Sequence, residues 1–247
     1  MVPRSSATQD FADRPPWTRP GFIASAALVL VVVIAGVVVA IASRDDDRST
    51  TGTPPPATLA PSEATPPQDL PTAVPTTAPA GVRWELVGQT AVPVSATAGP
   101  TRISGGTAAG YAHTPEGALM AAAQLMVRSA PSAGRDSWEP TVQRQFVSSS
   151  DREQLLAALG DNPDDSSEPG ELSQIAGYQY QSYTPDTAVI GLVLRAPSGG
   201  TARYHVLTLT LLWRDGDWRM QAPPGGAWIS LNRVTNDLTG VVEWGAR

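Results

Sequence analysis

The chain of 247 residues contains no cysteine, no lysine and only two histidines. The missing cysteines exclude disulfides, thiolate metal sites, a cysteine nucleophile and the lipidated cysteine of a lipoprotein. The missing lysines exclude a phosphate-binding P-loop. All 17 basic side chains are therefore arginines, against 23 acidic ones. With a net charge of −6 there is no basic stripe for phosphate contacts, so direct binding of nucleic acid is not expected.

Catalytic patterns are missing as well. The chain has no Gly-x-Ser-x-Gly elbow of a hydrolase and no strand-linked Gly-x-Gly-x-x-Gly loop. A histidine zinc site would need both His113 and His205 together with carboxylates, and no H-x-x-x-H spacing exists. The acidic segment 161–168 does not match a calcium loop, and we interpret it as a solvated turn. We therefore expect no enzymatic activity, no cofactor and no metal site.

A long apolar run occupies residues 22–42 and contains no charge. At about 1.5 Å per residue it would span about 30 Å, the thickness of the hydrocarbon core of a bilayer. The alternative is a cleaved signal peptide, because Ala-Ile-Ala at 40–42 resembles a cleavage triplet, but the apolar region of a signal is shorter. The sequence predicts a transmembrane helix at 21–43. Three arginines in the tail 1–20 favour a cytoplasmic N-terminus.

A proline- and threonine-rich segment follows, and residues 51–80 hold nine prolines and seven threonines. Such a segment stays extended at about 3.1 Å per residue, so it can reach on the order of 90 Å. Stalks of this composition are typical of exported proteins. We therefore predict a disordered linker at 44–81 that holds a globular domain, 82–247, outside the cell membrane. The lipid bilayer is then one partner of the chain.

The stretch "GYAHTPEGALMAAAQ", residues 110–124, predicts the start of a helix at 115–128. The Thr114 hydroxyl can cap it, and Pro115 suits the first position, where no N–H is needed. Glu116 favours the positive end of the helix dipole. Because the run that follows is apolar nearly all round, we expect this helix to be enclosed by the rest of the domain.

The remaining elements are predicted from periodicity and turn residues. Residues 84–94 and 101–103 suggest short extended pieces. A second helix is expected at 150–159, with Gly160 as its stop and a polar loop at 161–171. Strands are expected at 172–183, 187–195, 202–214 and 217–222.

The dipeptide Asp-Gly at 215–216 favours a two-residue hairpin. This turn would pair Trp213 with Trp218, Leu211 with Met220 and Leu209 with Ala222 on an apolar face. Arg214 with Asp217, Leu212 with Arg219 and Thr210 with Gln221 would lie on a mixed face. One covered face is what a sheet packed against helices requires. The sequence therefore predicts an α+β domain with helices packed on an antiparallel sheet.

Several side chains could serve either a site or the core. His205 falls on the face of Leu207 and Leu209, where it is either a base at a pocket mouth or, as we favour, a histidine at the edge of the core. His113 precedes the helix cap, where it packs on the first turn or bonds a carbonyl; a pH-sensitive contact is the alternative. Pocket lining or partner binding is the alternative to core packing for Tyr178, Tyr180, Trp84, Trp138, Trp228 and Trp244.

The order of helices and long strands, with the closing hairpin "LLWRDGDWRM" (211–220), resembles the cone-shaped fold of nuclear transport factor 2. In that fold a strongly curved sheet wraps around a long helix. A tail, one span, a stalk and such a domain together resemble the bitopic scaffold subunits of type IV secretion and their Gram-positive, TcpC-like counterparts.

The phrases "GYAHTPEGAL" (110–119) and "AVPVSATAGP" (91–100) resemble those of uncharacterised membrane proteins encoded near conjugation genes in high-GC Gram-positive bacteria. The resemblance covers about 82–247. The NPxG segment associated with the Gram-negative scaffolds is absent, since "DNPD" at 161–164 does not match it.

These resemblances imply a membrane-anchored, non-enzymatic scaffold or assembly subunit of a conjugative transfer apparatus. Its partners would be other proteins of that apparatus or further copies of itself. The alternatives are a tethered ligand-binding or enzymatic domain of the cone fold, and a cell-envelope accessory protein unrelated to DNA transfer.

Overall fold

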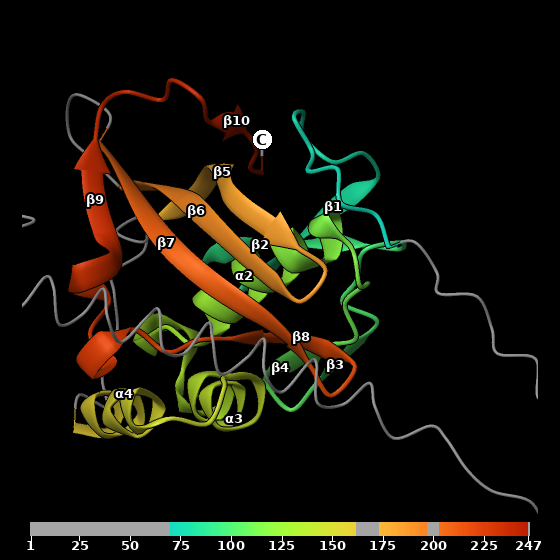
Figure 1. The fold of residues 1–247 in the computed structure, drawn as a ribbon. Helices are drawn as coiled ribbons and strands as arrows, with labels where there is room; N and C mark the ends of the chain where they lie inside the picture. The colour runs from blue at the N-terminus through green and yellow to red at the C-terminus, as the bar shows by residue number, and fades with distance from the viewer. Residues whose placement is uncertain (1–69, 162–172, 197–202, 247) are drawn as a thin grey trace, which may run out of the picture. The chain divides into compact units, whose positions relative to one another are not determined.

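The computed structural model describes residues 70–161, 173–196 and 203–246, all within one compact unit, Pro66–Arg247. The unit is an α+β domain with antiparallel sheets, as predicted (Figure 1). Its strands are β1 (Val82–Val87), β2 (Thr90–Ser95), β3 (Arg102–Ser104), β4 (Thr107–Ala109), β5 (Gln174–Thr184), β6 (Thr187–Ala196), β7 (Arg203–Arg214), β8 (Asp217–Met220), β9 (Asn232–Thr235) and β10 (Val242–Glu243). Its helices are α2 (Pro115–Arg128), α3 (Arg135–Gln145) and α4 (Ser150–Asp161), with the 3-10 turns η2 (Pro131–Ala133), η3 (Pro224–Gly226) and η4 (Trp228–Leu231).

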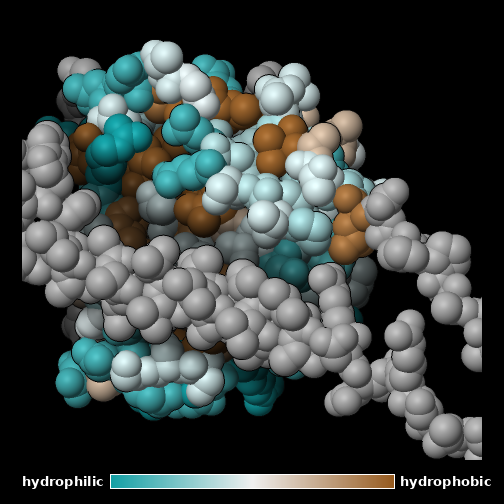
Figure 2. Space-filling model, in the orientation of Figure 1, coloured by the Kyte–Doolittle hydropathy of each residue, from teal (hydrophilic) through white to brown (hydrophobic). Residues whose placement is uncertain are grey.

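The main sheet has the strand order β10-β5-β6-β7-β8, and β9 pairs with the other half of β7's outer edge. Helix α2 lies behind this sheet in Figure 1, while α3 and α4 lie below it, near β8. On the face toward the viewer, Figure 2 shows hydrophobic residues scattered among hydrophilic ones, without one large apolar patch on the described part. The domain core therefore lies between α2 and the inner face of the sheet.

Helix α2 begins and ends where the sequence predicted. The Gly117 N–H donates to Thr114 Oγ1 at 3.1 Å, Pro115 occupies the first turn, and Arg128 is the last residue. Every residue from Ala118 to Leu125 is buried. The predicted enclosure of this helix is confirmed, and its cap alone contributes about 1 kcal/mol to stability.

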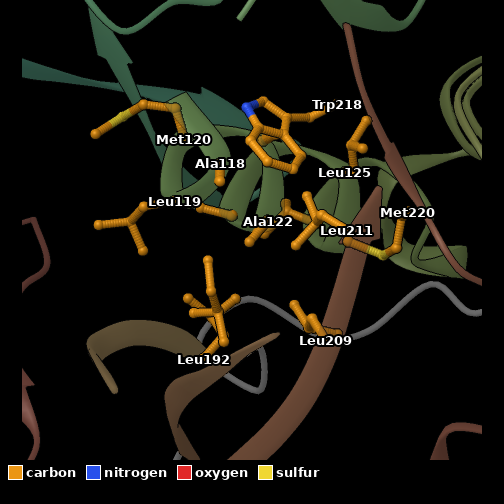
Figure 3. Packing of buried hydrophobic residues seen from close by; sticks show 14 of the residues in the cluster. Ala118, Leu119, Met120, Ala122, Leu125, Leu192, Leu209, Leu211, Trp218 and Met220 are labelled. Atoms are coloured by element: carbon orange, nitrogen blue, oxygen red, sulfur yellow. The ribbon is translucent and has the colours of Figure 1, made fainter. Parts of the chain in front are cut away.

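Side chains from α2 interdigitate with those of the sheet (Figure 3). Leu119, Met120 and Leu125 are fully buried on the helix; Leu125 lies beside buried residues of β7 and β8, whereas Met120 points away from them. The labelled sheet residues of this contact are Leu192, Leu209, Leu211, Trp218 and Met220. Burying a leucine-sized side chain contributes about 1.5–3 kcal/mol, so this contact is a large source of stability for the domain.

The hairpin of β7 and β8 has the predicted register. Trp213 pairs with Trp218, and Leu211 pairs with Met220. Asp215 and Gly216 both have positive φ, 54° and 75°, as a type I′ turn requires. Strand β8 ends at Met220, so the pairs predicted beyond it are not part of the ladder; one further bond, from the Gln221 N–H to Thr210 O at 2.9 Å, extends the pairing.

Helix α3 was not predicted, because Pro140 lies inside it. A proline in a helix interior removes one N–H donor and usually argues against helix. Here Trp138 and Val142, four residues apart, are both buried and fix one face of α3 to the core. Helix α4 was predicted, but it passes through Gly160 and ends at Asp161, so the expected stop at Gly160 was wrong.

Strands β4, β9 and β10 were not predicted either, since each has at most four residues and carries little periodicity. Within 70–161, 173–196 and 203–246 no helix is long and apolar enough to cross a membrane. The apolar run 22–42, for which a span was predicted, lies outside the described residues. So does the linker up to residue 69, whereas its last part, 70–81, is described and contacts the domain.

Candidate functional site

His113 contacts two segments that are far from it in the sequence, the hairpin of β7 and β8 and the turn between β5 and β6. Its ring stacks on Trp213, with centroids 3.9 Å apart and an interplanar angle of 4°, and meets the edge of Trp218 at 5.9 Å. Its Nε2 lies 2.6 Å from Pro185 O, to which it donates in the matching tautomer. The carbonyl that accepts this hydrogen bond therefore belongs to the turn between β5 and β6, not to the helix that follows His113.

His205 lies near the other end of β7. Its Nδ1 is within 3.2 Å of the Asn232 side-chain amide on β9. Trp213, which stacks on His113, is eight residues further along β7, which corresponds to about 26 Å. The two histidines therefore cannot share a zinc ion. Within the described residues there is no group of three side chains that could hold a metal.

The hydroxyls of Tyr178 and Tyr180 are both engaged by backbone carbonyls. Tyr178 donates to Thr77 O at 2.8 Å, and Tyr180 donates to Pro115 O at 2.5 Å. Burial raises the pKa of Tyr178 to about 12, with a smaller contribution from Glu116. Burial also raises the pKa of Tyr180. These tyrosines hold the segment before β1 and the start of α2, and they do not present free hydroxyls to a ligand.

The four candidate tryptophans fall into two groups. Trp138 is buried in α3 beneath the Arg135 guanidinium, and Trp228 packs against the edge of Phe146. Trp84 and Trp244 lie together, with centroids 5.1 Å apart. Trp244 also meets Tyr178 edge-on at 5.5 Å. This second group borders a hollow of the surface.

That hollow, which we call the terminal cavity, has a volume of about 460 Å³. It lies between the segment before β1, the ends of β5–β7 and the C-terminal segment. Its walls are formed by Ala78, Pro79, Gly81, Val82, Trp84, Ile175, Ala176, Arg195, Tyr204, Leu238, Glu243, Trp244, Gly245 and Ala246. Arg195 and Tyr204 are paired across β6 and β7.

The terminal cavity carries groups that can bind a polar or aromatic ligand. Arg195 can donate to an anion, Glu243 can accept, and the two tryptophans offer apolar faces. Among the described residues that line the cavity there is no serine, threonine or histidine that could form a nucleophile and base pair. Of the residues singled out in the sequence, Trp84 and Trp244 meet here, while both histidines lie elsewhere.

Asp217 is a buried carboxylate whose role was not predicted. It was placed on the mixed face of the hairpin, yet its Oδ2 accepts the Gly110 N–H at 2.8 Å and its Oδ1 the Tyr111 N–H at 3.0 Å. Burial raises the pKa of Tyr111, and the negative charge of Asp217 raises it further. Asp217 therefore fastens the segment before α2 to the hairpin. No local pattern signals this contact, because its partners are more than 100 residues away.

A second polar network joins α2 to the strands beside it. Arg128 donates from Nε to Gln124 Oε1 at 2.8 Å and from its guanidinium to Gly106 O at 2.9 Å. Gln124 in turn donates to Pro93 O at 2.8 Å. Burial lowers the pKa of Arg128, and the nearby Tyr111 and Glu85 oppose that shift. These polar groups have their hydrogen-bond partners within the fold.

Comparison with known proteins gives a family match. No curated protein and no solved structure matches the chain significantly. A family model described as a domain of unknown function, DUF8175, matches residues 45–243. The match covers more than half of the chain and includes the whole region from β1 to β10. The chain therefore belongs to the DUF8175 family.

Proposed function

We propose that this protein is a membrane-anchored, non-enzymatic scaffold or assembly subunit of a conjugative transfer apparatus related to type IV secretion. Residues 1–20 then lie in the cytoplasm, residues 21–43 cross the cell membrane, and residues 44–81 hold the domain 82–247 outside. The partners are the bilayer, other proteins of the apparatus and further copies of the chain.

The filled interior under α2 is the observation that carries this proposal. A domain that binds or converts a small ligand between a helix and a sheet needs open space there, with polar groups that converge on it. In this domain Leu125, Leu211 and Met220 are fully buried at that position. The hydroxyls of Tyr178 and Tyr180 are taken by backbone carbonyls. These features favour a protein that acts through its surface.

The proposal includes the fold relationship. We assign the domain to the cone-shaped class of nuclear transport factor 2, in which a curved antiparallel sheet encloses a helix. Three long neighbouring strands, β5–β7, support this assignment, as does the apolar helix α2 packed against one of their faces. The hairpin of β7 and β8, in which Trp218 and Met220 are buried, supports it as well.

Gene deletion tests the scaffold role. Deletion is expected to abolish DNA transfer while growth and wall integrity stay normal. The full chain supplied in trans should restore transfer, and a chain that lacks residues 21–43 should not, because it is no longer held at the membrane. Normal transfer frequency in the deletion strain would contradict the proposal. So would the absence of coupling ATPase and channel genes next to the gene.

The terminal cavity favours a second candidate, a tethered ligand-binding domain. Its two tryptophans and the opposite charges of Arg195 and Glu243 could orient a small polar molecule. Substitutions Arg195→Ala and Glu243→Ala separate the candidates. Both leave transfer at the wild-type level if the chain is a scaffold alone, whereas loss of function with an intact fold would favour ligand binding.

A further inference from the structure

The hairpin of β1 and β2 forms a small sheet of its own, and its two outer edges differ. The β2 edge is closed. Ala91 donates its N–H to Gln174 Oε1 at 3.1 Å, Pro93 O accepts from Gln124, and Ser95 exchanges two backbone bonds of 2.9 Å with Gly99. Each backbone group named here points away from β1. Residues 91, 93 and 95 are therefore the outward-facing positions of β2.

This pattern determines which peptide groups of β1 face outward. The register pairs Leu86 with Ala91, Trp84 with Pro93 and Val82 with Ser95. In an antiparallel ladder, two residues that face each other either both point their peptide groups at one another or both point them outward. The N–H and C=O groups of Val82, Trp84 and Leu86 therefore point to the outer edge of β1.

The outer edge of β1 is open within the described part of the chain. No described residue forms a hydrogen bond with the peptide groups of Val82, Trp84 or Leu86 across this edge. The Leu86 side chain is 72% exposed, the second-highest exposure among the large hydrophobic residues of the described part. Native proteins usually cover or blunt such an edge, because it can pair with another strand.

Two charges beside Trp84 identify the strand that fits this edge. Arg83 and Glu85 flank it on the opposite face and form a pair at 2.9 Å, with side chains that are 70% and 42% exposed. We infer that β1 pairs antiparallel with β1 of a second copy about a two-fold axis at Trp84. Arg83 of each copy then lies opposite Glu85 of the other, and Val82 lies opposite the exposed Leu86.

The geometry of this pairing is consistent along the whole strand. Trp84 lies opposite Trp84 of the second copy, and Val82 lies opposite Leu86 of the second copy. All of these residues point their peptide groups outward, so each pair exchanges two backbone hydrogen bonds. Arg83 and Glu85 occupy the intervening positions, where facing side chains approach most closely. The exposed Leu86 side chain gains an apolar neighbour.

The charges also reject the neighbouring registers. A two-fold axis at Arg83 would place Arg83 opposite Arg83, and an axis at Glu85 would place Glu85 opposite Glu85. Like charges directly opposite each other destabilise a ladder. The axis at Trp84 is the arrangement that gives opposite charges on both sides and also uses all three outward positions.

This contact deepens the proposed scaffold role, on which its biological meaning rests, by naming a second copy as partner. The scaffold role and the β1 contact are tested by separate measurements. Loss of transfer on deletion addresses the role, whereas the pairing of β1 is read directly from a covalent link between two copies. A β1 contact without a transfer defect would contradict only the role, and a transfer defect without a β1 contact would contradict only this inference.

Disulfide trapping in membranes tests the pairing on the full chain, which has no cysteine of its own. One tagged copy carries Arg83→Cys and a second, differently tagged copy carries Glu85→Cys. Oxidation should link the two tags. The matched control places Arg102→Cys and Ser104→Cys on β3, another exposed edge strand with the same spacing. A mixed link no stronger than that of the control overturns the inference.

Charge exchange provides a second, independent measurement. Arg83→Glu makes both flanking positions acidic, and Glu85→Arg makes both basic, so each variant alone should lose self-association by about tenfold or more. Mixing the two variants should restore it, because acidic positions then meet basic ones. A misfolded chain would not be rescued by mixing. Equal association of the separate and the mixed variants, measured by sedimentation in detergent, overturns the inference.

Discussion

The interior under α2 and the outer edge of β1 differ in whether their groups have partners within the domain. Under α2, apolar side chains are fully buried and the polar groups of Gln124 and Arg128 have internal partners. On β1, the peptide groups of Val82, Trp84 and Leu86 point outward with no partner in the described part. The first region stabilises the domain. The second contributes little to stability, and it has the features of a surface that meets another strand.

The largest expected effect is on the interior. Leu119→Ala should lower the free energy of unfolding by about 2–5 kcal/mol, because a fully buried side chain leaves a cavity. Leu86→Ala is the matched control, since the same atoms are removed from a side chain that is 72% exposed. It should change stability by no more than about 0.5 kcal/mol. Urea unfolding of both variants measures the difference, and similar losses would contradict the comparison.

Removal of the Asp217 carboxylate should have the next largest effect. Asp217→Ala leaves the N–H groups of Gly110 and Tyr111 without their acceptor, at a total cost of about 1–3 kcal/mol, since only the Tyr111 N–H is fully buried. Asp186→Ala, on the exposed turn between β5 and β6, is the control and should leave the unfolding midpoint nearly unchanged. An Asp217 variant as stable as this control would show that the carboxylate does not fasten the hairpin.

Tyr178→Phe should cost about 1 kcal/mol near neutral pH, because the bond to Thr77 O is lost. The cost should depend on pH. The pKa of Tyr178 is raised to about 12 in the folded state, above about 10 in an unfolded chain. This contribution is complete below pH 10 and disappears as the pH rises from 10 to 12. Denaturation of wild type and variant at several pH values should show their difference shrinking in that range, and a constant difference would contradict it.

The smallest expected effect on stability is at the β1 edge. Leu86→Pro removes an N–H that points outward, so the ladder with β2 is kept and the fold should change little. The same change should abolish the cysteine link between two β1 strands. Glu85→Pro is the contrasting variant, because its N–H points toward Val92 and the hairpin should be lost. Circular dichroism and disulfide trapping together separate these outcomes.

Local signals in the sequence predicted the local structure well. Thr114 and Pro115 located the start of α2, and Asp-Gly at 215–216 predicted the register of the last hairpin. Both depend on residues within one turn or one strand pair. The sequence also predicted the α+β class, because helical and strand periods are each continuous in these segments.

Features that depend on distant contacts were not predicted. Helix α3 tolerates Pro140 because Trp138 and Val142 are buried against elements elsewhere in the chain. The burial of Asp217 requires Gly110 and Tyr111. Short strands such as β9 and β10 are defined by their neighbours in the main sheet rather than by their own residues. The terminal cavity could not be predicted for the same reason, since it joins both ends of the domain.

The hydrogen bond between Tyr178 and Thr77 also determines how the domain responds to tension. Thr77 lies upstream of β1, and Tyr178 lies in β5, in the middle of the ladder with β6. A force applied through the N-terminal side of the chain therefore reaches β5 before it reaches Val82, the first residue of β1. In single-molecule pulling, release of Thr77 should precede the opening of the β1 hairpin, and Tyr178→Phe should lower the force of that first event alone.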